Sequence, residues 1–222
     1  MTATASSPAT WPNNVFVTEE RAASPRTFGL TVAIPRTGEE CDRLLVQARI
    51  RMRMPEMRAP FAKELARFLG AGSTVWTMDR RHSLHVLLES AGEDAVEPVL
   101  ASVARTPRAE VVDDAELVLA GFARQSSTNV RVLVQRLGSA DSAPVRAALL
   151  RSLAAVGDPS ATPSIERALD DDSAEVRDAA ATAVSLLGGT NARSALSRRL
   201  GRERNPVVLA SLKDALEQLE DA

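Results

Sequence analysis

The chain has 222 residues, a formal net charge of −2, 45% hydrophobic residues and only 3% aromatic residues, with no tyrosine. This charge disfavours a nucleic-acid partner, because neutralisation of phosphates usually demands a basic excess. The single cysteine, Cys41, excludes an internal disulfide and fits a reducing cytoplasm, and no stretch approaches the ~20 apolar residues of a membrane-spanning helix.

Residues 1–38 differ from the rest of the chain. They contain four prolines and two short runs of β-forming residues, Val15–Val17 and Phe28–Ile34, with no further strand in the sequence for these runs to join. We expect an extended or partly disordered segment that pairs with a strand of a partner, and a fold that does not need it. The side chains assigned to this contact are Val15, Phe16, Val17, Phe28 and Leu30.

The next segment is predicted to form a degenerate first pair of helices. Thr37 and Glu40 have the spacing of a capping box, before a helix from Cys41 to about Met52. Phe61–Leu69 is a further helix. The stretch from residue 43 to residue 58 holds five arginines and three methionines, which is an alternative binding surface.

Two further helix pairs are predicted before residue 140. The first is His82–Ala91 with Ala95–Ala104, in which Gly92 and Pro98 have the spacing of Gly157 and Pro163 later on. The second is a longer copy with helices at Val111–Ala123 and Asn129–Leu137.

His82 and His85, the only histidines, lie on one face of the first of these helices, with Asp79 nearby. A zinc site needs three or four ligands. We therefore predict no metal and no other cofactor.

The clearest repeat lies after residue 144. Residues 145–174 align with residues 176–205 at an offset of 31, so that Val145, Arg146 and Gly157 fall on Val176, Arg177 and Gly188. A repeat of this length predicts stacked helical hairpins, in which each repeat contacts only its neighbours.

Each first helix of these copies carries one apolar stripe. From Val176 the apolar residues recur at i, i+3, i+4, i+7, i+8 and i+11, the period of a helix face. An N-terminal cap at Asp172 with Glu175, a stop at Gly157 and a second helix starting at Thr162-Pro163 fit this pattern. The last stripe, from Val208 to Leu219, has a polar opposite face and suits a terminal cap.

Over residues 145–200 the sequence resembles HEAT-like repeats of the type first named from bilin lyases. The resemblance lies in Val145-Arg146-Ala147-Ala148, in Val156-Gly157-Asp158-Pro159 and in Val176-Arg177-Asp178-Ala179-Ala180. It implies an all-α fold, an α-solenoid of HEAT-type helical hairpins from residue 39 to residue 222, clearest over residues 80–222. For function it implies a binding surface and little else.

In such repeats the second helices line the concave face. The residues two before Leu137, Leu169 and Leu200 are Gln135, Arg167 and Arg198, and we assign this row to partner binding, with Ser102 equivalent in an earlier copy. By resemblance, Arg146 and Arg177 are structural arginines. Their expected acidic partners, in the turns between repeats, are Asp141, Asp171 and Asp172.

No catalytic pattern is evident, since a phosphate-binding glycine loop, a Cys/His pair with motif spacing and a nucleophile elbow are all missing. We therefore predict a non-catalytic scaffold or adaptor subunit whose partner is another protein. A bilin-lyase-like chromophore-handling factor is the first alternative. A HEAT-like DNA glycosylase is the second, disfavoured by 21 acidic against 15 basic residues after residue 88.

Overall fold

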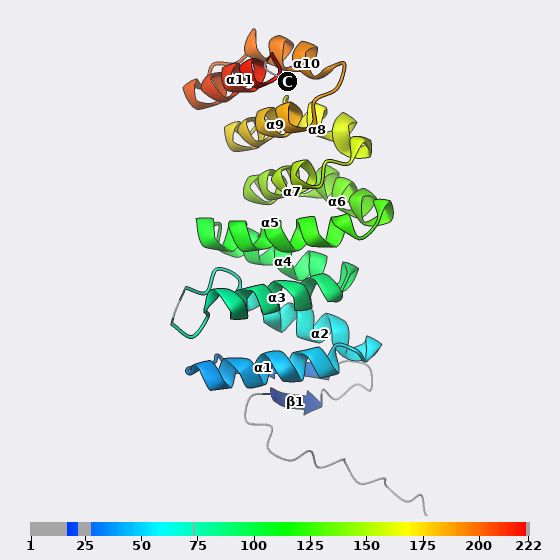
Figure 1. The fold of residues 1–222 in the computed structure, drawn as a ribbon, viewed down its shortest axis with the longest axis vertical. Helices are drawn as coiled ribbons and strands as arrows, with labels where there is room; N and C mark the ends of the chain where they lie inside the picture. Colours follow the sequence, from blue (N-terminus) through cyan, green and yellow to red (C-terminus); the bar gives the residue numbers. More distant parts are fainter. Residues whose placement is uncertain (1–16, 22–27, 73, 221–222) are drawn as a thin grey trace, which may run out of the picture.

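The computed structural model describes residues 17–21, 28–72 and 74–220. Its helices stack in chain order, from α1 at one end to α11 at the other (Figure 1). The predicted all-α solenoid with a non-helical N-terminal segment is confirmed. One helix of each pair packs on the same helix of the next pair. These first helices are α1 (Gly38–Arg51), α3 (Met78–Ser90), α5 (Ala109–Arg124), α7 (Ala143–Val156), α9 (Ala174–Leu187) and α11 (Pro206–Gln218).

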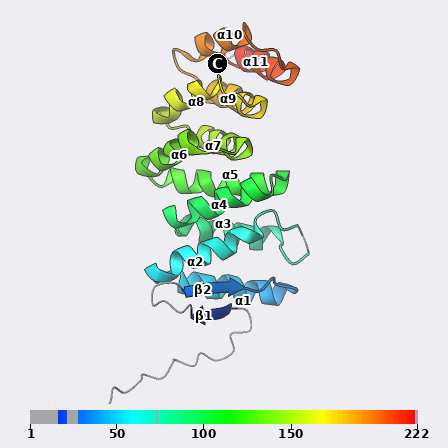
Figure 2. The same cartoon turned by 180° about the vertical axis from the view of Figure 1, so that it is seen from behind.

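The second helices form the other layer of the stack (Figure 2). They are α2 (Pro55–Leu65), α4 (Glu93–Arg105), α6 (Ser127–Ser139), α8 (Thr162–Ala168) and α10 (Ala192–Leu200). Two short 3-10 helices extend this layer, η1 (Ala66–Phe68) after α2 and η2 (Pro159–Ala161) before α8. Within the described part of the chain, no helix is long and apolar enough to cross a membrane.

A β-hairpin precedes α1. Strand β1 (Val17–Arg21) pairs antiparallel with β2 (Phe28–Val32), with Val17 opposite Val32. The backbone N–H of Val32 donates to Glu64 Oε2 on α2 at 3.1 Å, and the Val32 side chain is buried in the core. The expectation that the apolar runs have no strand to join is therefore wrong. Removal of residues 1–36 would therefore also remove the buried Val32 side chain from the core.

Helices α7 and α9 pack closely on each other, and several of their buried residues are alanines. On α7 and α9 the fully buried Ala147, Ala148, Ala180 and Ala181 leave little side chain between the helix axes. Interaxial distance depends on the side chains at the contact, and alanine also costs no rotamer entropy in a helix. Leucines fill the spaces on either side, among them Leu149, Leu150 and Leu153.

Helix ends lie at the predicted capping residues with one exception. Gly157 ends α7 in the left-handed conformation, with φ of +75°, and Thr37 Oγ1 accepts from the Glu40 N–H at the start of α1. The cap of α9 differs, because its N-cap residue is Ser173 and not Asp172. Pro98 lies inside α4, as the predicted helix Ala95–Ala104 implied.

The alanine contacts predict that α9 does not tolerate a larger core side chain. We expect Ala180→Leu, at a fully buried position, to destabilise the protein by about 1–3 kcal/mol, because an overpacked core forces helices apart or side chains off their rotamers. Thr182→Leu, on the exposed side of the same helix, is the matched control and should change stability by less than about 0.5 kcal/mol. Urea denaturation measures both, and equal effects would contradict the proposed packing.

Candidate functional site

The three residues assigned to a partner-binding row are exposed on the second-helix layer. Gln135 and Arg167 lie on α6 and α8 and line the same cavity, of about 280 Å³. Arg198 lies on α10, outside the lining of that cavity. The structure therefore brings two members of the row together, while their role in binding stays a prediction.

Arg167 and Arg198 are held along their own helices by neutral groups. Arg167 Nε donates to the Pro163 carbonyl at 3.1 Å and Nη2 to Ser164 Oγ at 2.9 Å. Arg198 Nη1 donates to Ser194 Oγ at 2.6 Å. Within the described ranges no carboxylate lies within ion-pair distance of either guanidinium. Both positive charges are therefore oriented and available to an external acceptor.

Similar cavities lie between other neighbouring second helices. One of about 330 Å³ separates α4 from α6 and is lined by Leu100, Ala101 and Ala104, with the Glu97–Arg136 ion pair across it at 2.9 Å. Another of about 280 Å³ lies between η1 and the end of α4. The second-helix layer therefore carries three hollows in succession, from η1 to α8.

Ser102 is not part of the exposed row. Its side chain is buried, and Oγ lies 2.9 Å from the Ala66 carbonyl and 3.1 Å from the Pro98 carbonyl. The predicted equivalence with Gln135 was wrong, because Ser102 faces the contact between η1 and α4.

Arg146 connects one repeat to the next through a bidentate ion pair. Its Nε and Nη2 donate to the two carboxylate oxygens of Asp171 at 2.8 and 2.9 Å. Its Nη1 donates to the backbone carbonyls of Ala140 and Asp141. Asp141 therefore contributes its carbonyl and not the carboxylate that was expected.

Arg177 repeats this arrangement one step along the stack. It donates to Glu203 at 2.7 and 3.1 Å, while its Nη1 donates to the carbonyls of Asp171 and Asp172. The predicted pairing with the Asp172 carboxylate was wrong, because the acid comes from the following turn. Asp171 links both steps, since its carboxylate binds one arginine and its carbonyl the next.

The pairs Arg146–Asp171 and Arg177–Glu203 form a ladder of ion pairs between repeats. Glu203 is the most enclosed acid of this ladder, with a side chain 2% exposed. The hydrogen bond from Arg177 holds the pKa of Glu203 far below its usual value. The backbone N–H groups of Asn205 and Arg204 and the side chain of Arg199 act in the same direction, against the effect of burial. These contacts therefore stabilise the ionised form of Glu203 in the last turn between repeats.

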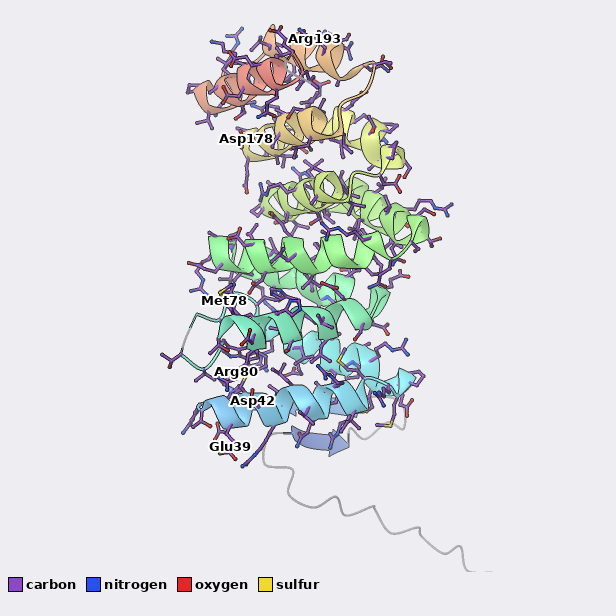
Figure 3. The ribbon with its side chains drawn as sticks, in the orientation of Figure 1. Glu39, Asp42, Met78, Arg80, Asp178 and Arg193 are labelled. Carbon is purple, nitrogen blue, oxygen red and sulfur yellow. The ribbon has the colours of Figure 1, made fainter. Side chains whose placement is uncertain are left out.

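Related contacts connect the earlier repeats. Arg80 on α3 forms a bidentate pair with Asp42 on α1, at 2.7 and 2.9 Å (Figure 3). On α5 the buried carboxylate of Asp114 accepts from the Gly70 N–H and from Arg81, both at 2.6 Å, and lies 3.0 Å from His85 Nε2. Burial opposes ionisation, but these contacts together lower the pKa of Asp114.

Of the two histidines, His85 takes part in this packing, whereas His82 is exposed on the same helix. His85 is buried against Asp114, and among the described residues no group of three or more His, Cys, Asp and Glu side chains is placed to hold a metal.

Two of the residues assigned to the N-terminal contact, Val15 and Phe16, lie outside the described residues. The backbones of Val17, Phe28 and Leu30 belong to the hairpin, where Leu30 pairs with Glu19 and Phe28 with Arg21. These residues pair within the chain, and an additional contact with a partner strand stays a prediction.

Sequence reasoning missed Glu203 and the Asp42–Arg80 and Asp114 contacts. The offset between Asp171 and Glu203 is 32, close to the repeat length, so the repeat itself could have identified Glu203 as the second acid of the ladder. The Asp114 contacts carry no such signal, because Gly70, Arg81 and His85 do not recur at that spacing.

Comparisons with known proteins identify the repeat. A family model described as HEAT repeats matches residues 130–217. No curated protein is similar enough to the chain to count as a match.

The similar solved structures include designed repeat proteins. A computationally designed armadillo repeat protein for modular peptide recognition has a TM-score of 0.50 and 18% identity, covering 82% of this chain and 87% of its own. A designed armadillo repeat protein in complex with the peptide (KR)4 has a TM-score of 0.46 and 16% identity, covering 83% of this chain and 87% of its own. At such identities the likeness concerns the fold alone.

The ladder predicts that the two classes of arginine differ in their effect on stability. Arg177→Ala should cost about 2–3 kcal/mol, because it leaves Glu203 enclosed with Arg199 as its remaining cation. Arg167→Ala removes an exposed arginine of a second helix and should cost less than about 0.5 kcal/mol. Chemical denaturation of both variants tests this. If the ladder does not stabilise the fold, both variants will lose a similar, small amount of unfolding free energy.

The lowered pKa of Glu203 predicts a dependence of stability on pH. Because the folded state favours the carboxylate, its contribution is fully present above the ordinary glutamate pKa of ~4.3 and is lost progressively as the pH falls below it. Glu203→Gln should flatten the decline of unfolding free energy between about pH 5 and pH 3. Glu175→Gln, at an exposed position on α9, should retain the wild-type profile. Superimposable profiles for all three proteins would contradict this role.

Proposed function

From the premise that the chain is a HEAT-like repeat protein, matched over residues 130–217, we propose that it is a non-catalytic scaffold or adaptor subunit. Its partner is an extended segment of another protein, which lies along the second-helix layer. The supporting observation is the succession of three cavities in that layer, two of which are lined by arginines with no carboxylate partner among the described residues. The designed armadillo proteins support only the fold, so the proposal rests on this surface.

The charges of the second helices α6, α8 and α10 favour an acidic segment. Helices α6, α8 and α10 together carry six arginines and a single carboxylate, Glu166. Arg136, Arg193 and Arg199 pair with Glu97, Glu220 and Glu203. The other three, Arg131, Arg167 and Arg198, have no carboxylate partner within the described residues. Electrostatic complementarity of this kind mainly provides specificity and a faster association rate.

The spacing of the layer suits an extended chain. Neighbouring helices pack about 8–10 Å apart, and an extended chain rises about 3.3 Å per residue. About three residues of the segment therefore correspond to one repeat. A segment with an acidic or apolar residue at every third position would present one side chain to each cavity.

The test is capture of the partner from the native host, followed by affinity measurements with two double variants. Arg167→Glu with Arg198→Glu should weaken binding at least about tenfold, corresponding to ~1.4 kcal/mol, by placing acids opposite an acidic segment. Arg124→Glu with Lys213→Glu makes the same change in net charge on first helices and should bind as wild type.

Unchanged affinity of the second-helix variant for the captured protein would contradict the assignment of this surface. A shift of the visible spectrum on mixing with an open-chain tetrapyrrole would instead favour the chromophore-handling alternative. Retardation of DNA at low salt would favour the DNA-binding one. A variant lacking residues 1–16 keeps both strands, and tests the contribution of Val15 and Phe16 without removing Val32 from the core.

A further inference from the structure

The first of the three cavities differs from the other two in charge. It lies between η1, the C-terminal end of α4 and the turn that leads to α5. Three of its lining residues are arginines, Arg67, Arg105 and Arg108, and no carboxylate of a described residue lines it. Guanidinium groups are always charged, so a hollow lined by arginines attracts an anionic group.

Arg105 is positioned at this cavity by a contact between repeats. Its Nη2 donates to Ser102 Oγ at 3.1 Å, and that buried hydroxyl lies 2.9 Å from the carbonyl of Ala66 at the start of η1. Ser102 therefore fixes the head of Arg105 to the wall of the cavity. One of the five N–H groups of the guanidinium makes this contact, which leaves others for a ligand.

The remaining two arginines differ in their partners. Arg67 Nη1 donates to Glu64 Oε2 at 2.6 Å, and Glu64 also accepts from the Val32 N–H, outside the cavity lining. For Arg108 no side-chain hydrogen bond or ion pair is found with any residue that the structure describes. Arg105 and Arg108 therefore both lack a carboxylate, and the cavity has an uncompensated positive charge.

We propose that this cavity is an oxyanion site, which takes a carboxylate or phosphoryl group on a side chain of the partner segment. The inference rests on the proposed function, since it assigns one contact of that segment. The site lies at the N-terminal end of the row of cavities, so an anchored residue here sets the register of the segment over α4, α6 and α8. Arginine forks match both carboxylate and phosphoryl oxygens.

The surroundings favour one anionic group over a polyanion. Helix α4 has Arg105 at its C-terminal end but Glu93, Asp94 and Glu97 towards its N-terminal end. A nucleic acid that crossed the layer would bring its phosphates against these carboxylates, whereas a protein segment anchored by one acidic or phosphorylated side chain can place uncharged residues over them. Binding at the cavity should weaken as salt is added, because the contact is between charges near the surface.

The first experiment uses inorganic phosphate and acetate as probes of the full-length protein, followed by amide NMR. Signals from residues 102–111 should shift and saturate with phosphate, and more weakly with acetate. Arg105→Gln with Arg108→Gln should reduce the phosphate affinity at least tenfold. Arg167→Gln with Arg198→Gln removes the same charge elsewhere on the layer and should leave it unchanged. Shifts spread over all exposed arginines, or equal affinity in the two variants, would overturn the site.

The second experiment separates this site from the proposed function. Both double variants are titrated with the captured partner, before and after phosphatase treatment and with its acidic residues changed to amides. Loss of affinity in both variants supports the site, and the two treatments distinguish a phosphoryl group from a carboxylate. Loss in the Arg167/Arg198 variant alone overturns the cavity as an anchor and retains the proposed function. If neither variant loses affinity, the proposed surface fails, and the phosphate titration decides the oxyanion site by itself.

Discussion

The close approach of the first helices is the constraint on which the rest of the structure depends. In α7 and α9 the fully buried Ala148 and Ala180 are compatible with such an approach, because the distance between helix axes depends on the side chains at the contact. Each apolar stripe is then buried mainly by the neighbouring repeats, so no helix pair is a complete core by itself. The hairpin strand β2, which packs on α2, closes one end of this stack by burying Val32.

The arginine ladder follows from the same constraint. Once the first helices are in contact, Arg146 and Arg177 reach the turn of the next repeat, and Asp171 and Glu203 meet them with both carboxylate oxygens. A bidentate pair defines direction as well as distance, so it fixes the rotation between repeats. The acids Asp171 and Glu203 in the turns are thereby paired with arginines of the first helices. Arg167 and Arg198 on the second helices are exposed to solvent.

This division of charge is hidden by a net charge of −2. Averaged over the chain, acids and bases nearly cancel, which argued against a nucleic-acid partner. In the fold, many of the acids lie on first helices and turns, while α6, α8 and α10 are basic. A surface that selects an acidic segment is therefore compatible with a chain of nearly neutral charge.

The sequence by itself determined the class of fold, because a repeat of 31 residues with a 3.6-residue apolar period fixes both the helices and their stacking partners. It identified Arg146 and Arg177 as structural, and glycine at position 157 as a helix stop. Only the tertiary structure decided which acid each arginine meets, because three adjacent aspartates at residues 170–172 are equivalent in sequence and differ only in direction. For the same reason it alone gathered Arg105 and Arg108 beside η1, since a contact between repeats has no fixed spacing along the chain.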